Sequence, residues 1–130
     1  MTQLQEQFDT RAPWETRFWF DGVPYGGEYD PQDDARIAMF KSMAGPLSGL
    51  RVLELGPLEG GHTLQLARLG QGGCHRRPRP NYEQCLFIKE LFGLDGAQFI
   101  HGNLRDFDLP SLGPFDAIFN VGVLYHLDEP

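Results

Sequence analysis

The residues best suited to chemistry lie in one stretch, where a run of apolar side chains contains an acid near its end and is followed by three glycines. Arg51–Leu55 predicts a short buried strand with an acid, Glu54, near its end. Gly56 permits a sharp turn after that strand, and Gly60 and Gly61 allow a ligand or a packing partner to approach the backbone closely. A strand, a glycine loop and a helix in this order build a nucleotide-type pocket at the carboxyl end of the strand.

The elements that must position this loop alternate between helices and strands. Helical spacing follows the loop directly and stops at Gly70, and the next helix is stopped by Gly93. The predicted elements after the first strand are a helix over Thr63–Leu69, a helix over Asn81–Phe92, a strand over Ala97–Ile100, a strand over Phe115–Val121 and the start of a helix at Val123–Leu127. This alternation predicts an α/β fold with a parallel sheet, right-handed crossovers and flanking helices.

Upstream of the first strand, one further helix is predicted. Asp30 is suited to be its N-cap, Pro31 to its first position, and Asp33 and Asp34 to its first turn. The pair at positions 45–46, Gly-Pro, ends it. Its apolar face is predicted to consist of Ile37, Phe40 and Met43.

Residues 1–30 are rich in aromatic side chains and in turn formers, and they predict an extended arm with a short strand near Phe18–Phe20. Two interpretations of this arm remain open. It covers the core of the domain, or it acts as a lid over a cofactor or substrate.

Composition limits the classes of function. The chain has 130 residues, 41% of them hydrophobic, with a net charge of −7. The acidity disfavours wholesale nucleic-acid binding, and DNA is not an expected partner. No apolar run reaches the ~18 residues of a membrane span. Cys74 and Cys85 form neither a disulfide framework nor a metal-ligand spacing, so no metal is expected and the cytoplasm is the expected compartment.

Two motifs, in the expected order, carry a family resemblance that covers residues 45–130. Glu54–Gly61 resembles the acid-x-Gly-x-x-x-Gly loop of the class I, Rossmann-like S-adenosylmethionine-dependent methyltransferases. Phe115–Leu127 is similar to the fourth strand of that family and the loop after it. The resemblance implies S-adenosyl-L-methionine as the cofactor and a small molecule or an RNA base as the methyl acceptor. It divides the chain into an arm or lid, residues 1–30, and a partial cofactor-binding domain, residues 31–130.

The resemblance also implies roles for individual residues. His126 is the candidate for a base or substrate orienter, although packing or capping is an alternative role for it. His62 and Asn103 also have purely structural alternatives, His62 as a helix-start residue and Asn103 as a turn residue. Asp116 is expected to anchor the start of its strand. The implied cofactor-binding residues are Glu54, Gly56, Pro57, Glu59, Gly60, Gly61, His62, Asn103, Leu104, Asn120 and Val121.

One segment departs from the family pattern. The family places a second strand after the first helix, ending in an acid that binds the ribose hydroxyls. Residues 71–80 have neither an apolar run nor an acid, and they contain three arginines and two prolines. The segment is either a basic loop for a phosphate or an RNA, or an out-of-frame patch over residues 74–80. One encoding of Cys-His-Arg-Arg, read one base later, gives Val-Ile-Gly and the start of another Val codon, and resequencing the DNA tests this.

The C-terminal strands of the family have no counterpart before Pro130, so the sheet is expected to be incomplete and the chain a fragment of a longer reading frame. A truncated methyltransferase is therefore the leading hypothesis. A Rossmann-like binding module without catalysis, or an inactive fragment, is the alternative. A nicotinamide-dependent dehydrogenase is disfavoured, because Leu58 stands where the second glycine of its fingerprint belongs.

Overall fold

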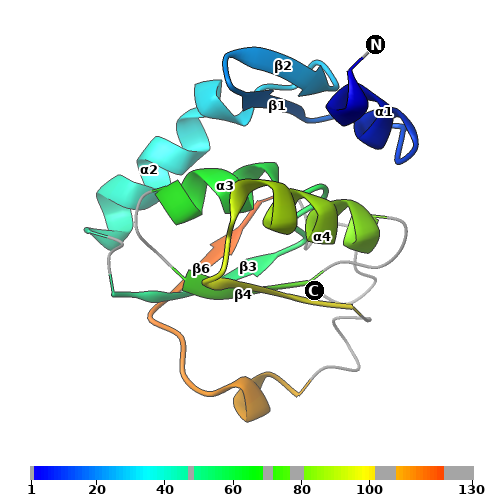
Figure 1. The fold of residues 1–130 in the computed structure, drawn as a ribbon. Helices are drawn as coiled ribbons and strands as arrows, with labels where there is room; N and C mark the ends of the chain where they lie inside the picture. Colours follow the sequence, from blue (N-terminus) through cyan, green and yellow to red (C-terminus); the bar gives the residue numbers. More distant parts are fainter. Residues whose placement is uncertain (1, 47–48, 69–71, 77–80, 102–107, 122–130) are drawn as a thin grey trace, which may run out of the picture.

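The computed structural model describes residues 2–46, 49–68, 72–76, 81–101 and 108–121. Their centre is a four-stranded sheet in which all neighbouring strands run parallel (Figure 1). Its spatial order is β5-β4-β3-β6, where β3 is Arg51–Leu55, β4 is Gly72–Arg76, β5 is Ala97–Ile100 and β6 is Ala117–Asn120. The predicted α/β fold with a Rossmann-like parallel sheet is confirmed.

Strand β3 occupies the interior of this sheet, because it pairs with β4 on one side and β6 on the other. Val52 is fully buried and Leu53 is 3% exposed, as the apolar run predicts. Asp116 precedes β6 and accepts a hydrogen bond from the Arg51 amide at 2.7 Å, so it anchors the strand start as expected. The glycine loop thus emerges at the carboxyl end of an interior strand, where ligands of open α/β sheets bind.

Two helices, α3 (Gly61–Arg68) and α4 (Asn81–Phe92), lie along one face of the sheet (Figure 1). Their bounds agree with the predicted helices to within a few residues. One core cluster joins these helices to β5 and the N-terminal arm, and a second joins helix α2 (Ala35–Ala44), β3, α3 and β6. Both crossovers therefore bury their apolar faces on the sheet.

The N-terminal arm, residues 1–30, folds into helix α1 (Gln3–Asp9) and an antiparallel hairpin of β1 (Arg17–Phe20) and β2 (Val23–Gly26). The strand near Phe18 is confirmed, whereas α1 was not predicted. Phe8 and Phe18 are each 1% exposed and belong to the core cluster with α4. The arm thus covers the core, and its action as a lid stays a prediction.

The helix predicted from Pro31 onward is two elements. A 3-10 turn, η1 (Pro31–Asp33), has Asp30 as its cap, and α2 (Ala35–Ala44) begins after a second cap, Asp34. Asp34 is therefore a capping residue and not part of a first turn. Met43, predicted on the apolar face, is 80% exposed, because α2 packs through the face that carries Ile37, Phe40 and Ala44.

Strand β4 corrects the prediction that residues 71–80 lack the second strand. Gly72–Arg76 pairs with β3 and β5 in continuous register, with Cys74 beside Leu53 and Gln98. Backbone hydrogen bonds from both neighbours hold this segment extended, although its own residue types do not favour a strand. Residues 77–80 lie outside the described residues, and the out-of-frame hypothesis stays a prediction.

Strand β6 is shorter than predicted, because Phe115 and Asp116 belong to the turn before it. A 3-10 turn, η3 (Leu109–Leu112), precedes that turn. The helix predicted at Val123–Leu127 lies outside the described residues. Among the helices in the described part of the chain, none has the length and apolarity that crossing a membrane requires.

Candidate functional site

The loop that follows β3 is sharply bent. Gly56, Leu58 and Gly60 all have positive φ angles, of 65°, 53° and 91°. Leu58 is the unusual member, because a side chain with a Cβ rarely adopts this conformation. Its carbonyl accepts a hydrogen bond from the Cys85 thiol on α4 at 3.2 Å, which holds the bend. Left-handed residues concentrated in so short a loop are typical of ligand-binding turns.

Glu54 ties the strand to the helix that follows the loop. It is 1% exposed, and its Oε1 atom accepts a hydrogen bond from the Thr63 hydroxyl at 2.6 Å. A buried carboxylate needs such donors, because leaving it without them is costly. The pair closes the base of the loop and fixes where α3 starts.

Glu59 belongs to the loop, but its side chain points to the N-terminal arm. The carboxylate is 2% exposed and accepts hydrogen bonds from the backbone amides of Glu15, at 2.9 Å, and Thr16, at 2.7 Å. The side chain is thus committed to the arm. The predicted cofactor contact at this position is therefore left to the Glu59 backbone and stays a prediction.

The two later glycines of the loop make room for different neighbours. A Cβ at Gly61 would lie 2.6 Å from the Thr16 Cγ2 and 3.2 Å from a Pro31 ring carbon, so this glycine accommodates the arm. A Cβ at Gly60 would make only ordinary contacts with Ile88 and Phe99. At Gly61, the close approach to the backbone that the sequence predicted is therefore made by a packing partner, Thr16.

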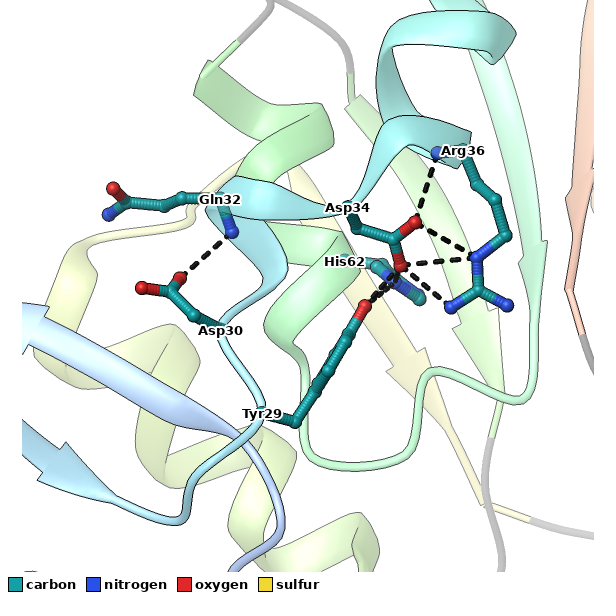
Figure 2. Close-up of polar contacts among 6 residues, drawn as sticks. All are labelled: Tyr29, Asp30, Gln32, Asp34, Arg36 and His62. Carbon is teal, nitrogen blue, oxygen red and sulfur yellow. Dashed lines mark hydrogen bonds and ion pairs between the residues drawn. The ribbon is translucent and has the colours of Figure 1, made fainter.

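His62, at the start of α3, joins a polar cluster that also contains Tyr29, Asp34 and Arg36 (Figure 2). Its Nε2 atom lies 2.8 Å from Asp34 Oδ2 and 2.8 Å from the Tyr29 hydroxyl. The Tyr29 hydroxyl donates to Asp34, and the Arg36 guanidinium forms a bidentate ion pair with the same carboxylate, at 2.9 and 2.7 Å. The cluster links the arm, the start of α2 and the start of α3.

Electrostatics in this cluster favour one protonation pattern. Hydrogen bonds from Arg36 lower the pKa of Asp34 well below its usual range. Burial, with a further contribution from the hydrogen bond to Asp34, raises the pKa of Tyr29 to about 12. The hydrogen bond to Asp34 also raises the pKa of Arg36. At neutral pH the cluster therefore holds an ionised Asp34 and a neutral tyrosine that donates its proton.

An open cleft of about 520 Å³ lies beside this cluster. Two arginines, Arg17 and Arg36, and four acidic residues from the hairpin exit and the start of α2 line it. Its lining residues are Arg17, Glu28, Tyr29, Asp30, Asp33, Asp34, Ala35 and Arg36. Such a lining offers many hydrogen-bonding groups and an excess of negative charge.

Asn120 is the last residue of β6, pairs in register with Leu55 and is exposed, so it lies beside the point where the loop begins. Val121 follows it and is half-buried. Asn103, Leu104 and His126 lie outside the described residues. In the part of the chain that the structure describes, no group of three potential metal ligands occurs.

Four residues around the loop and the start of α3 were not predicted as part of the site: Thr16, which lies against Gly61, and Tyr29, Asp34 and Arg36, which form the cluster with His62. A signal was present for one of them, because Asp34 precedes a helical run as N-caps do. Thr16 and Tyr29 meet Gly61 and His62 only through the tertiary fold, and Arg36 joins the cluster through Asp34, so no spacing rule connects these three residues to the glycine loop.

The fold and the bent loop define an α/β protein of the nucleotide-binding class. No family model matches the chain. A curated relative, the tRNA U34 carboxymethyltransferase of Syntrophotalea carbinolica, is 29% identical over 99% of this chain and 41% of its own. The crystal structure of EvdMO1 is 34% identical, with a TM-score of 0.82 over 98% of this chain and 30% of that one.

The N-terminal domain of EvdMO1, crystallised in the presence of SAH and D-fucose, is 31% identical, with a TM-score of 0.79 over 96% of this chain and 54% of that one. The fold also matches a protein-L-isoaspartate O-methyltransferase, at 24% identity and a TM-score of 0.61, over 81% of this chain and 33% of that one. The chain therefore shares the fold of the class I, Rossmann-like S-adenosylmethionine-dependent methyltransferases, and these similarities support the family resemblance of its two motifs. It spans about two-fifths of the curated relative's length.

Proposed function

We propose that the loop Gly56–Gly61 binds S-adenosyl-L-methionine and that the protein, over the longer length its relatives have, transfers the methyl group of this cofactor. The observation that carries the proposal is the position of the bent loop, at the carboxyl end of the interior strand β3 and before the N-terminus of α3. A neighbour with the same fold over 96% of this chain was crystallised with SAH.

The residues present fit this cofactor. The positive φ angles at Gly56, Leu58 and Gly60 curve the backbone of the loop at the carboxyl end of β3. Glu54 and Thr63 hold the two ends of that curve together, and Asn120 offers an exposed amide at the neighbouring strand end. The cofactor, when bound, supplies a methyl group already activated by a positive sulfur. The protein then has mainly to align donor and acceptor and to exclude water.

For the acceptor, we propose a small hydroxylated molecule in preference to an RNA. The cleft beside the His62 cluster is lined by four acidic residues and two arginines, and the chain carries a net charge of −7. Both disfavour a polyanionic backbone, whereas carboxylates and guanidinium groups bind neutral hydroxyls well. The D-fucose present with the EvdMO1 domain is a molecule of this chemical class.

The experiment is calorimetric titration of the chain with SAH, followed by titration of the SAH complex with D-fucose or with an anticodon stem-loop that carries U34. Saturable SAH binding supports the cofactor assignment, and no binding up to millimolar concentration contradicts it. Binding of D-fucose and not of the stem-loop supports the small acceptor. The reverse result assigns the protein to RNA modification.

A second candidate is a binding module without catalysis. Strand β4 ends at Arg76, a cationic residue type at the strand end where the family carries its ribose-binding acid. The variant Arg76→Glu restores the charge of that acid at the nearest described position. Increased SAH affinity in this variant indicates an enzyme with a damaged site, whereas unchanged affinity favours the module.

A further inference from the structure

The N-terminal arm is fastened to the glycine loop by one buried side chain. Two consecutive backbone amides, of Glu15 and Thr16, converge on the Glu59 carboxylate at distances of 2.7 to 3.1 Å. These residues are more than forty positions from Glu59, and the carboxylate is 2% exposed. Hydrogen bonds to a buried carboxyl group are costly to lose, because removing the acceptor leaves both amides without their partner.

Residues 15 and 16 are themselves hydrogen-bonded to the segment that follows the hairpin. The Thr16 carbonyl accepts from the Gly27 amide at 2.8 Å, and the Glu15 carbonyl accepts from the Tyr29 amide at 2.9 Å. A Cβ at Gly27 would lie 2.3 Å from the Glu15 carbonyl oxygen, so the two segments are in close contact. Holding residues 15 and 16 therefore also holds residues 27–29.

The carboxyl-terminal end of the arm makes a second attachment, just after the glycine loop. Tyr29 contacts Asp34 and His62, and His62 is only three positions beyond Glu59. Thr16 packs over Gly61 between these two attachments. The arm thus holds the carboxyl-terminal half of the loop at Glu59 and Gly61, and the start of α3 at His62.

We propose that Glu59 is a positioning residue that couples the N-terminal arm to the cofactor loop, so that docking of the arm sets the shape of the loop and thereby its affinity for the cofactor. The affinity part of this inference rests on the proposed function. The coupling part does not, because it concerns two segments of this chain in the absence of any ligand.

A matched control is provided by Gln84 on α4. Its side chain is 4% exposed, and its Nε2 atom donates to the carbonyls of Arg11 and Pro13, each at 2.8 Å. Like Glu59, it is a long buried side chain that holds the arm through two backbone groups. Unlike Glu59, it attaches the arm to a helix and not to the loop.

The first experiment compares hydrogen–deuterium exchange in Glu59→Ala, Gln84→Ala and the unmodified chain without ligand. Glu59→Ala should speed amide exchange in residues 13–29 and also in residues 56–61. Gln84→Ala should speed it in the arm but leave residues 56–61 unchanged. If both variants affect the loop equally, or neither does, the coupling is refuted. Glu59→Gln keeps one acceptor oxygen and should show a smaller effect of the same kind, which serves if the alanine variant does not fold.

The second experiment measures SAH affinity in the same variants by calorimetry. Glu59→Ala should weaken binding by at least about fivefold, the lower end of typical couplings between sites, with Glu59→Gln between it and the unmodified chain. Gln84→Ala should stay within about twofold of the unmodified chain. Equal losses in both alanine variants overturn the positioning role. If the unmodified chain does not bind SAH, the proposed function fails, and the exchange experiment alone then decides the coupling.

Discussion

The sheet contains two successive strand-and-helix units that differ in what holds them. In the first, β3 and α3, the strand carries buried apolar residues, and the loop and helix start are held by Glu54, Glu59 and His62. In the second, β4 and α4, the strand sequence is Gly-Gly-Cys-His-Arg, with no apolar run. Its helix is nonetheless well defined and buries Cys85, Phe87 and Ile88.

The comparison shows that a strand position can be specified in two ways. The first strand is specified by its own residues, whose burial stabilises the strand wherever it pairs. The second is specified by its neighbours, because β3 and β5 offer backbone donors and acceptors on both sides. Strand propensity measures fit to a half-buried surface more than an intrinsic backbone preference, which is why a poor sequence can occupy a good site.

The largest effect is expected at the first strand. Leu53→Ala removes a side chain that is 3% exposed in the middle of the sheet and should lower the free energy of unfolding by about 2–5 kcal/mol. Urea denaturation measures this. Ile118→Ala, on β6 at 58% exposure, is the control and should stay within about 0.5 kcal/mol. If the loss of stability in Leu53→Ala is as small as in Ile118→Ala, β3 is held in place by strand pairing alone, as β4 is.

A somewhat smaller effect is expected where the arm meets the loop of the first unit. Gly61→Ala should destabilise the protein by about 1–3 kcal/mol, because its Cβ overlaps the Thr16 methyl group. Adding Thr16→Ser removes that methyl group and should recover most of the loss. Denaturation of the two single variants and the double variant forms a cycle that measures the contact. A loss in stability that Thr16→Ser does not relieve would show that Gly61 is required for another reason.

At the second strand the expected effect has the opposite sign. Replacing Cys74 and His75 by Val and Ile gives β4 β-branched residues and should raise the free energy of unfolding by up to about 1 kcal/mol. The midpoint of urea denaturation is the readout. The same pair of changes at Gln3 and Gln5, on helix α1, is the control and should not stabilise. A destabilised β4 variant would contradict the view that this strand is poorly specified by its own residues.

The smallest effect concerns pH and the cluster around His62. The folded-state pKa of Asp34 is lowered, chiefly by Arg36, so its contribution to stability is present above its ordinary value near 4 and lost as the pH falls. The pKa of Tyr29 is raised to about 12, so its contribution is present below about 10 and lost as the pH rises toward 12. Thermal melts across this range should show both losses.

Two variants assign these losses. Asp34→Asn should flatten the acidic limb of the melting profile, and Tyr29→Phe should flatten the alkaline limb. Asp33→Asn removes the same formal charge one position away and should leave both limbs in place. An unchanged acidic limb in Asp34→Asn would mean that other carboxylates dominate acid unfolding.

Much of the fold could be predicted, because its signals are local. The turn at Gly56, the helix from Asn81 to its stop at Gly93 and the buried run of β3 follow from residue type and spacing over a few positions. The break between η1 and α2 could not, because Asp30 and Asp34 are equally good caps. Strand β4 could not either, because the signal for it lies in its neighbours.

The sequence by itself determined the order of elements and the glycine bend after β3, and it carried the family resemblance, since short-range conformational preferences and motifs depend on residues at nearby positions. Only the tertiary structure decided which groups surround that bend. Glu59 meets amides more than forty residues away, and His62 meets Tyr29 and Asp34. Such contacts depend on how separate segments pack, and a carboxylate or a hydroxyl is compatible with many partners until the fold brings one of them within hydrogen-bonding distance.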